Sequence, residues 1–130
     1  DRQVVLFTGD GSFQMCIEEL GTIMEQQAPV KIILLNNHYL GNVRQWQDLM
    51  FNHRRSFTYM LNPHYQMIAE GYGIKYDVVT SRDELKAKVE KMVKTDGPYI
   101  LECAVKEDEN VRPMVTPGCS VDEMQLHLDI

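Results

Sequence analysis

Apolar runs of strand length recur along the chain, and within residues 30–36 the aliphatic residues follow one another without a break from Ile32 to Leu35. A strand that is apolar on both faces is typical of a parallel sheet covered on both sides, because a sheet with one wet face alternates apolar and polar residues. Similar runs occupy residues 4–8, 74–79 and 99–105. Stretches of helical period separate them. This alternation predicts an α/β domain with three layers, a parallel sheet with helices on both faces and right-handed crossovers.

The helical stretches carry their own start and stop signals. Residues 13–27 place apolar side chains on one helical face, which should bury Cys16, and Pro29 ends the pattern. Ser81 and Glu84 have the spacing of a capping box at the start of another helix. Asn62 followed by proline predicts a further helix that reaches about residue 72, with Asn62 as its N-cap. Shorter helices are expected at residues 43–50 and 121–128.

Charge and cysteine usage narrow the classes of function. The 130 residues carry a formal net charge of −6, which disfavours nucleic-acid binding. No apolar run approaches the ~20 residues of a membrane span. The three cysteines form no CxxC pair and no cluster with histidine, so neither a disulfide framework nor a zinc site is indicated. We therefore expect a cytoplasmic protein that binds neither nucleic acid nor membrane.

The turn after the first expected strand can bind an anion. Gly9-Asp10-Gly11-Ser12 follows a strand and leads into a helix. Glycines let the backbone approach a ligand closely, and the unpaired amides of a helix N-terminus favour negative charge. Asp10 would repel a phosphate there unless a divalent cation lies between them. Magnesium takes oxygen ligands and commonly combines one or two protein oxygens with phosphate and water.

A second source of oxygen ligands, Asn36-Asn37, ends the next strand. Adjacent parallel strands lie about 5 Å apart, so Asp10 and Asn37 could face one ion. The residues alone leave an alternative open, because Asp-Gly and Asn-Asn after a strand are also common turn sequences. On this evidence a magnesium site and two ordinary turns remain comparable interpretations.

These two motifs carry a resemblance. Gly9-Asp10-Gly11 with Asn36-Asn37 resembles the thiamine diphosphate-binding motif of thiamine-dependent enzymes. Further matching segments make the chain similar, over nearly its whole length, to the catalytic large subunits of the acetohydroxyacid synthase (acetolactate synthase) family. These segments are Ser12 to Met15, Glu19-Leu20, Pro29 to Lys31, Leu34-Leu35, Leu40-Gly41, Gln45-Trp46, Pro113-Met114 and Gly118. The resemblance implies the thiamine diphosphate-binding fold, truncated on its N-terminal side.

The resemblance also implies roles for individual residues. Asp10 and Asn37 resemble magnesium ligands through their side chains, and Tyr39 through its backbone carbonyl. The diphosphate and its surroundings would be bound by the residues that flank these ligands, namely Gly9, Gly11, Ser12, His38 and Gly41. The substrate channel would be lined by Trp46, Asn42 and Pro117. Asn42 departs from the family, which usually has methionine after the glycine. No catalytic side chain is expected within these residues.

The implied activity is the decarboxylative condensation of pyruvate with a second 2-ketoacid such as 2-ketobutyrate, in branched-chain amino acid biosynthesis. Thiamine diphosphate and magnesium would be the cofactors, and FAD would bind elsewhere in the full-length protein. Partners would be a homodimer or tetramer and a possible small regulatory subunit. We expect residues 1–130 to be the carboxyl-terminal portion of the diphosphate-binding domain, with a tail from about residue 106, and to be inactive alone. Two alternatives are another thiamine enzyme, of the pyruvate oxidase or decarboxylase type, and a non-catalytic diphosphate-binding module.

Overall fold

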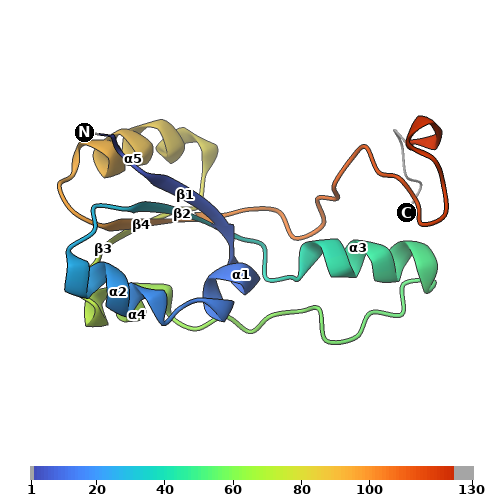
Figure 1. The fold of residues 1–130 in the computed structure, drawn as a ribbon, viewed down its shortest axis with the longest axis horizontal. Helices are drawn as coiled ribbons and strands as arrows, with labels where there is room; N and C mark the ends of the chain where they lie inside the picture. Colours follow the sequence, from blue (N-terminus) through green and yellow to red (C-terminus); the bar gives the residue numbers. More distant parts are fainter. Residues whose placement is uncertain (1, 125–130) are drawn as a thin grey trace.

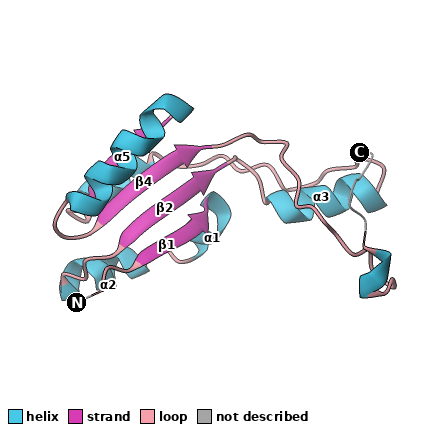
Figure 2. Cartoon of the chain, turned by 90° about the horizontal axis from the view of Figure 1, so that it is seen from above, coloured by secondary structure: helices cyan, strands magenta, loops and turns pink. Residues whose placement is uncertain are grey.

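A parallel sheet forms the centre of the structure, a computed structural model that describes residues 2–124. Its strands are β1 (Val5–Gly9), β2 (Lys31–Asn36), β3 (Lys75–Val79) and β4 (Tyr99–Ala104). Their order in the sheet is β1-β2-β4-β3, and every pair is parallel. Figure 2 shows the strands pointing in one direction, with their carboxyl ends toward α3 (Gly41–Met50). The parallel sheet expected from the apolar runs is confirmed.

Helices cover both faces of the sheet (Figure 1). One face packs against α5 (Arg82–Lys94), and the core there includes Met92 and Leu101. The other face packs against α1 (Asp10–Met15), α2 (Glu19–Gln26) and α4 (Tyr65–Gly71), around Leu34 and Ile100. The three-layer architecture is therefore confirmed. None of the helices within residues 2–124 has the length and hydrophobicity of a membrane span.

The single helix expected at residues 13–27 is wrong. The chain enters α1 directly at Asp10, turns at residues 16–18 and continues as α2. Because the two helices have separate axes, Phe13 is buried from α1 and Leu20 from α2, while Cys16 lies in the turn and is exposed. The expected burial of Cys16 is thus also wrong.

The start of α4 also differs from the expectation. The helix begins at Tyr65 with His64 as its N-cap, so Asn62 is not the cap residue. Its side chain instead makes tertiary hydrogen bonds described below. At the end of the chain, the expected helix at residues 121–128 appears as a 3₁₀ turn, Val121–Glu123. Residues 125–130 of that expectation lie outside the described residues.

Helix α3 projects from the sheet, and the carboxyl-terminal tail runs alongside it (Figures 1 and 2). The buried side chains of α3 are polar: Arg44, Gln45 and Asp48. Gln45 pairs with the backbone of Val111, donating from Nε2 to the carbonyl at 2.9 Å and accepting from the amide at 2.8 Å. Arg44 Nη2 donates to Asn110 Oδ1 at 2.8 Å. Amide pairing rather than an apolar core therefore holds the tail on α3.

We expect Gln45→Ala to release the tail locally. Two hydrogen bonds worth about 1 kcal/mol each would be lost, so the Val111 amide should exchange with solvent roughly 30-fold faster. Hydrogen exchange with mass spectrometry on the full-length protein measures this. Gln47→Ala is the matched control, because Gln47 bonds Ser56 and Thr58 in the loop that follows α3. Unchanged exchange at Val111 in Gln45→Ala, or faster exchange there in Gln47→Ala, would contradict this account.

Candidate functional site

The two motifs singled out in the sequence meet at one edge of the sheet. Strands β1 and β2 pair in parallel with Gly9 opposite Leu35, so their carboxyl ends lie side by side. The chain then enters α1 after β1 and the loop to α3 after β2. A cavity of about 380 Å³ opens between them. Its lining contains Gly9, Asp10, Gly11, Ser12, Leu35, Asn37, Tyr39, Leu40, Gly41, Asn42, Val43 and Val105.

Asp10 is the buried carboxylate of this cavity, with 1% of its surface exposed. It lies in the first turn of α1, where the helix amides favour negative charge. Its Oδ1 accepts from the Gly11 amide at 3.1 Å, and its Oδ2 accepts from Asn62 Nδ2 at 2.7 Å. Burial raises the pKa of the neighbouring Tyr65 to about 12, so its hydroxyl stays protonated at neutral pH.

Asn37 faces the same cavity from the end of β2. Its Oδ1 accepts from the Tyr39 amide at 3.1 Å, which holds the loop in a tight turn. A Cβ on Gly41 would come within 3.0 Å of Asn37 Nδ2, so glycine at this position lets α3 begin close to the asparagine. The loop is tied down further by Leu40, whose amide donates to Thr58 at 2.8 Å.

Three sequence-predicted residues lie elsewhere. The His38 backbone is in the left-handed region, with φ of 57°, and its ring lines a neighbouring cavity rather than the cavity of Asp10. Trp46 is half-buried on α3, and Pro117 is exposed in the tail. Neither belongs to the lining of the Asp10 cavity, whereas Asn42, the third predicted channel residue, does. The structure thus brings the expected metal ligands together but not the whole expected channel.

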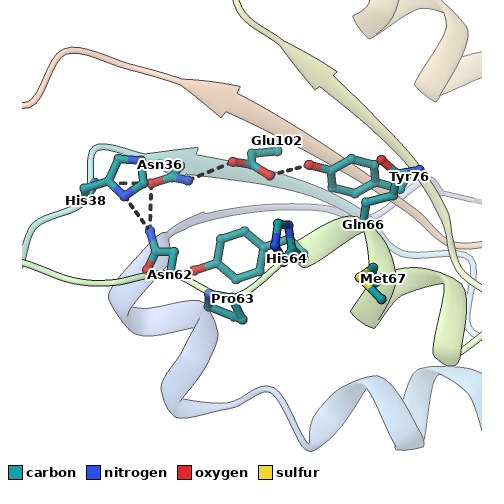
Figure 3. A pocket seen from close by; sticks show the side chains of 10 residues that line it. Asn36, His38, Asn62, Pro63, His64, Gln66, Met67, Tyr76 and Glu102 are labelled. Carbon is teal, nitrogen blue, oxygen red and sulfur yellow. Dashed lines mark hydrogen bonds between the residues drawn. The ribbon is translucent and has the colours of Figure 1, made fainter.

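The neighbouring cavity, of about 450 Å³, contains Glu102 and Tyr76, which the sequence did not single out, and Asn62, which it singled out only as a helix cap. Asn62, Asn36, Glu102 and Tyr76 form a row of hydrogen bonds along it (Figure 3). Asn62 resembled a helix cap because it precedes proline, and Glu102 lies within an otherwise apolar strand. The one sequence signal was this lone carboxylate in β4, since a charge in a covered strand needs a partner.

The donor set at the Asp10 cavity fits a hard cation. Asp10 offers a carboxylate and Asn37 an amide oxygen, and Tyr39 lines the same cavity. Oxygen donors of this kind suit magnesium rather than zinc or copper. Within residues 2–124, no group of three or more His, Cys, Asp and Glu side chains is arranged to hold a metal. An ion at Asp10 would therefore need further oxygens from its ligand and from water, which is the usual coordination of magnesium on a diphosphate.

An ion pair on α3 supports the loop that carries Tyr39. Arg55 donates to both oxygens of Asp48, at 2.7 and 2.8 Å, and its guanidinium lies 5.9 Å from the centre of the Tyr39 ring. The hydrogen bond from Arg55 holds the pKa of the Asp48 carboxyl below its usual range, against the opposing effect of burial. Asp48 is almost fully buried, and Arg55 is partly exposed.

This pair should make stability depend on acid pH. Because the folded-state pKa of Asp48 is lowered, its stabilisation is fully present above its unfolded-state pKa near 4 and is lost as the pH falls through the lower folded value. We expect Asp48→Asn to reduce the unfolding free energy by about 1 kcal/mol at pH 7, allowing for solvent around Arg55, and by less at pH 2.5. Urea unfolding across this range measures it, with the exposed Asp83→Asn as control. If Asp48→Asn lowered the unfolding free energy by the same amount at every pH from 7 to 2.5, the ion pair would not be the source of the pH dependence.

Comparison with protein families gives one match that covers most of the chain. The family model described as "Thiamine pyrophosphate enzyme, C-terminal TPP binding domain" matches residues 1–103. Solved structures agree with the fold. A thiamine diphosphate-dependent 4-hydroxybenzoylformate decarboxylase of Rhodococcus jostii RHA1 has a TM-score of 0.77 and 27% identity, over 85% of this chain and 21% of that chain.

Curated relatives are more similar in sequence. The acetolactate synthase isozyme 2 large subunit of Escherichia coli (strain K12) is 47% identical over 122 residues, which cover 93% of this chain and 22% of the relative. The acetolactate synthase large subunit of Porphyra purpurea is 42% identical over 123 residues, which cover 93% of this chain and 21% of the relative. The chain therefore spans about a fifth of the length of these relatives. The resemblance stated from the motifs is confirmed.

Proposed function

The chain belongs to the thiamine pyrophosphate enzyme family, as a C-terminal TPP binding domain, and we propose that it anchors magnesium and the diphosphate of thiamine diphosphate in an acetolactate synthase. The observation that carries this proposal is the convergence of Asp10 and Asn37 on one cavity at the carboxyl ends of adjacent parallel strands. Ligands of open α/β sheets bind at this edge. On this proposal, residues 1–130 are the carboxyl-terminal portion of the cofactor domain, with a tail from about residue 106.

Each residue predicted from the sequence then has a task. Asp10 and Asn37 would hold the cation with their side-chain oxygens, and Tyr39 with its backbone carbonyl. Gly9, Gly11 and Ser12 would bind the diphosphate with backbone and hydroxyl groups, and His38 and Gly41 would shape its surroundings. Trp46, Asn42 and Pro117 would line the substrate channel of the assembled protein. When bound, thiamine diphosphate supplies the electron sink for decarboxylating a 2-ketoacid, and these residues anchor and orient it.

The activity of the whole protein is part of the proposal. Its substrates would be pyruvate and a second 2-ketoacid such as 2-ketobutyrate, and its product would enter branched-chain amino acid biosynthesis. FAD would bind outside these residues. The catalytic subunit would form a homodimer or tetramer in the cytoplasm, with a possible small regulatory subunit. The identity of 47% to an acetolactate synthase large subunit supports this choice over other enzymes of the family.

The test is the product that the full-length protein forms from pyruvate. With magnesium, thiamine diphosphate and FAD we expect acetolactate, detected after acid conversion to acetoin. Acetaldehyde or acetate as the main product would instead support the second candidate, a decarboxylase or oxidase, which the fold shared with the Rhodococcus decarboxylase keeps open. Cofactor binding without turnover of pyruvate would support a non-catalytic module.

The isolated chain provides a further prediction. We expect residues 1–130 alone to form no acetolactate, because the relatives are several times longer and no catalytic side chain is proposed here. The same assay applies, with the full-length protein at equal molar concentration as the positive control. Acetolactate above the rate of a protein-free blank would show that the chain contains a complete active site.

A further inference from the structure

Resting on the proposed function, we propose that Asn62 is a positioning residue for the cation site, and that a hydrogen-bonded row running back to Glu102 fixes its direction. The row starts at Asp10 in the first cavity and passes through Asn62 and Asn36 to Glu102 on β4. Outer partners of this kind orient a metal ligand and are worth about 10- to 100-fold in metal affinity.

Asn62 is the centre of the row. Its Nδ2 donates to Asp10 Oδ2 at 2.7 Å and to Asn36 Oδ1 at 2.9 Å, which uses both of its hydrogens. Its Oδ1 accepts from Gln14 Nε2 at 2.7 Å. The side chain thus links α1, the end of β2 and the segment before α4. Asn62 engages Asp10 Oδ2, and the Gly11 amide donates to Oδ1 at 3.1 Å, so the two bonds together fix the orientation of the carboxylate that would bind the cation.

Glu102 sets the direction in which the amides point. Glu102 accepts from two donors, the Tyr76 hydroxyl on Oε2 and Asn36 Nδ2 on Oε1, the latter at 2.7 Å, so the NH₂ group of Asn36 is turned toward Glu102. The carbonyl of Asn36 then faces the other way and accepts from Asn62 and from the His38 amide, the latter at 3.1 Å. Asn62 is left with its NH₂ toward Asp10. The direction of every hydrogen bond in the row is therefore set by Glu102, which is the third side chain along the row from Asp10.

The far end of the row is closed by Tyr76, whose hydroxyl donates to Glu102 Oε2 (Figure 3). Burial raises the pKa of Tyr76, and its bond to Glu102 raises it further, so the phenol remains a donor at neutral pH. Asn36 is 7% exposed, which makes the three hydrogen bonds of its side chain costly to break. Glu102 is thus held on both oxygens and has little freedom to turn away from Asn36.

The experiment measures magnesium binding to the full-length protein by calorimetry at saturating thiamine diphosphate. We expect Asn62→Ala to raise the magnesium Kd by about 10- to 100-fold. Gln66→Ala is the matched control, because Gln66 is an exposed amide on the rim of the same cavity and bonds Glu70 instead. It should leave the Kd unchanged. Thermal unfolding without cofactor reports the structural effect of each variant separately.

A pair of variants at Glu102 tests the row without touching the cation site. Glu102→Ala frees the Asn36 amide to turn, so the magnesium Kd should rise by about 10-fold. Glu102→Gln should restore most of the affinity, since its carbonyl can accept from Asn36 while its NH₂ faces the Tyr76 oxygen. A purely structural role would lower the unfolding midpoint of both without this recovery. This pair also decides the matter if Asn62→Ala does not fold.

The outcomes separate the two proposals. Suppose that the wild type binds magnesium. A change of less than about 3-fold in the magnesium Kd of Asn62→Ala, or equal losses of affinity in Glu102→Ala and Glu102→Gln, would then overturn the positioning role and leave the proposed function intact. No binding of magnesium and thiamine diphosphate by the wild type would overturn both. A loss of magnesium affinity in Asn62→Ala, together with higher affinity in Glu102→Gln than in Glu102→Ala, supports the positioning role of the row.

Discussion

Replacing Asp10 with asparagine should weaken magnesium-dependent binding of thiamine diphosphate by about 100-fold or more, because a charged ligand contributes more than its outer partners do. The asparagine keeps the size of the side chain and one acceptor oxygen, so the bond from Asn62 can persist. The charge at the cation site is removed, and the new NH₂ group replaces Oδ1, which accepts from the Gly11 amide in the wild type. Calorimetric titration of the full-length protein with thiamine diphosphate, with and without magnesium, measures the effect.

The matched control for this variant is Asp83→Asn. Asp83 also lies in the first turn of a helix, α5, but it is exposed and far along the chain from the cavity. Its replacement should leave cofactor affinity unchanged. Equal affinity of Asp10→Asn and the wild type would remove Asp10 from the set of cation ligands, while equal losses in both variants would point to a general effect of charge.

The largest expected effect on stability comes from Leu34→Ala. Leu34 lies on the interior strand β2, has no exposed surface and packs in the core beneath α1 and α4. Removing a buried leucine side chain costs about 2–5 kcal/mol through lost apolar burial and the cavity that remains. A change of this size should lower the urea midpoint of the full-length protein clearly, as followed by circular dichroism. Since β2 carries Asn37 at its end, cofactor affinity should fall as well.

Leu35 offers the control on the same strand. Its side chain points to the opposite face and is 40% exposed. Leu35→Ala should therefore cost less than about 1.5 kcal/mol. Equal destabilisation by the two variants would mean that both faces of β2 are buried to the same degree in the full-length protein, contrary to the burial described here.

The strands and the meeting of the two motifs followed from local sequence. The aliphatic run before Asn36 is typical of a parallel strand that is covered on both faces. Asp10 and Asn37 come directly after the ends of β1 and β2. Once β1 and β2 are neighbours, covalent connection alone brings these residues to one edge. The single helix predicted at residues 13–27 was wrong because the spacing of apolar residues does not reveal that the chain turns near Cys16 and starts a second helix.

What the sequence determined by itself is thus the class of fold, the cofactor motif and the family. Only the tertiary structure decided that β4 lies between β2 and β3 and that α3 buries polar side chains against the tail. It also decided that Asn62 donates a hydrogen bond to Asp10 instead of capping a helix. The reason is physical. Periodicity and turn chemistry act between near neighbours, whereas Asn62 and Asp10 are 52 positions apart. The hydrogen-bond partner of a half-buried amide is set by which segments pack together in the fold.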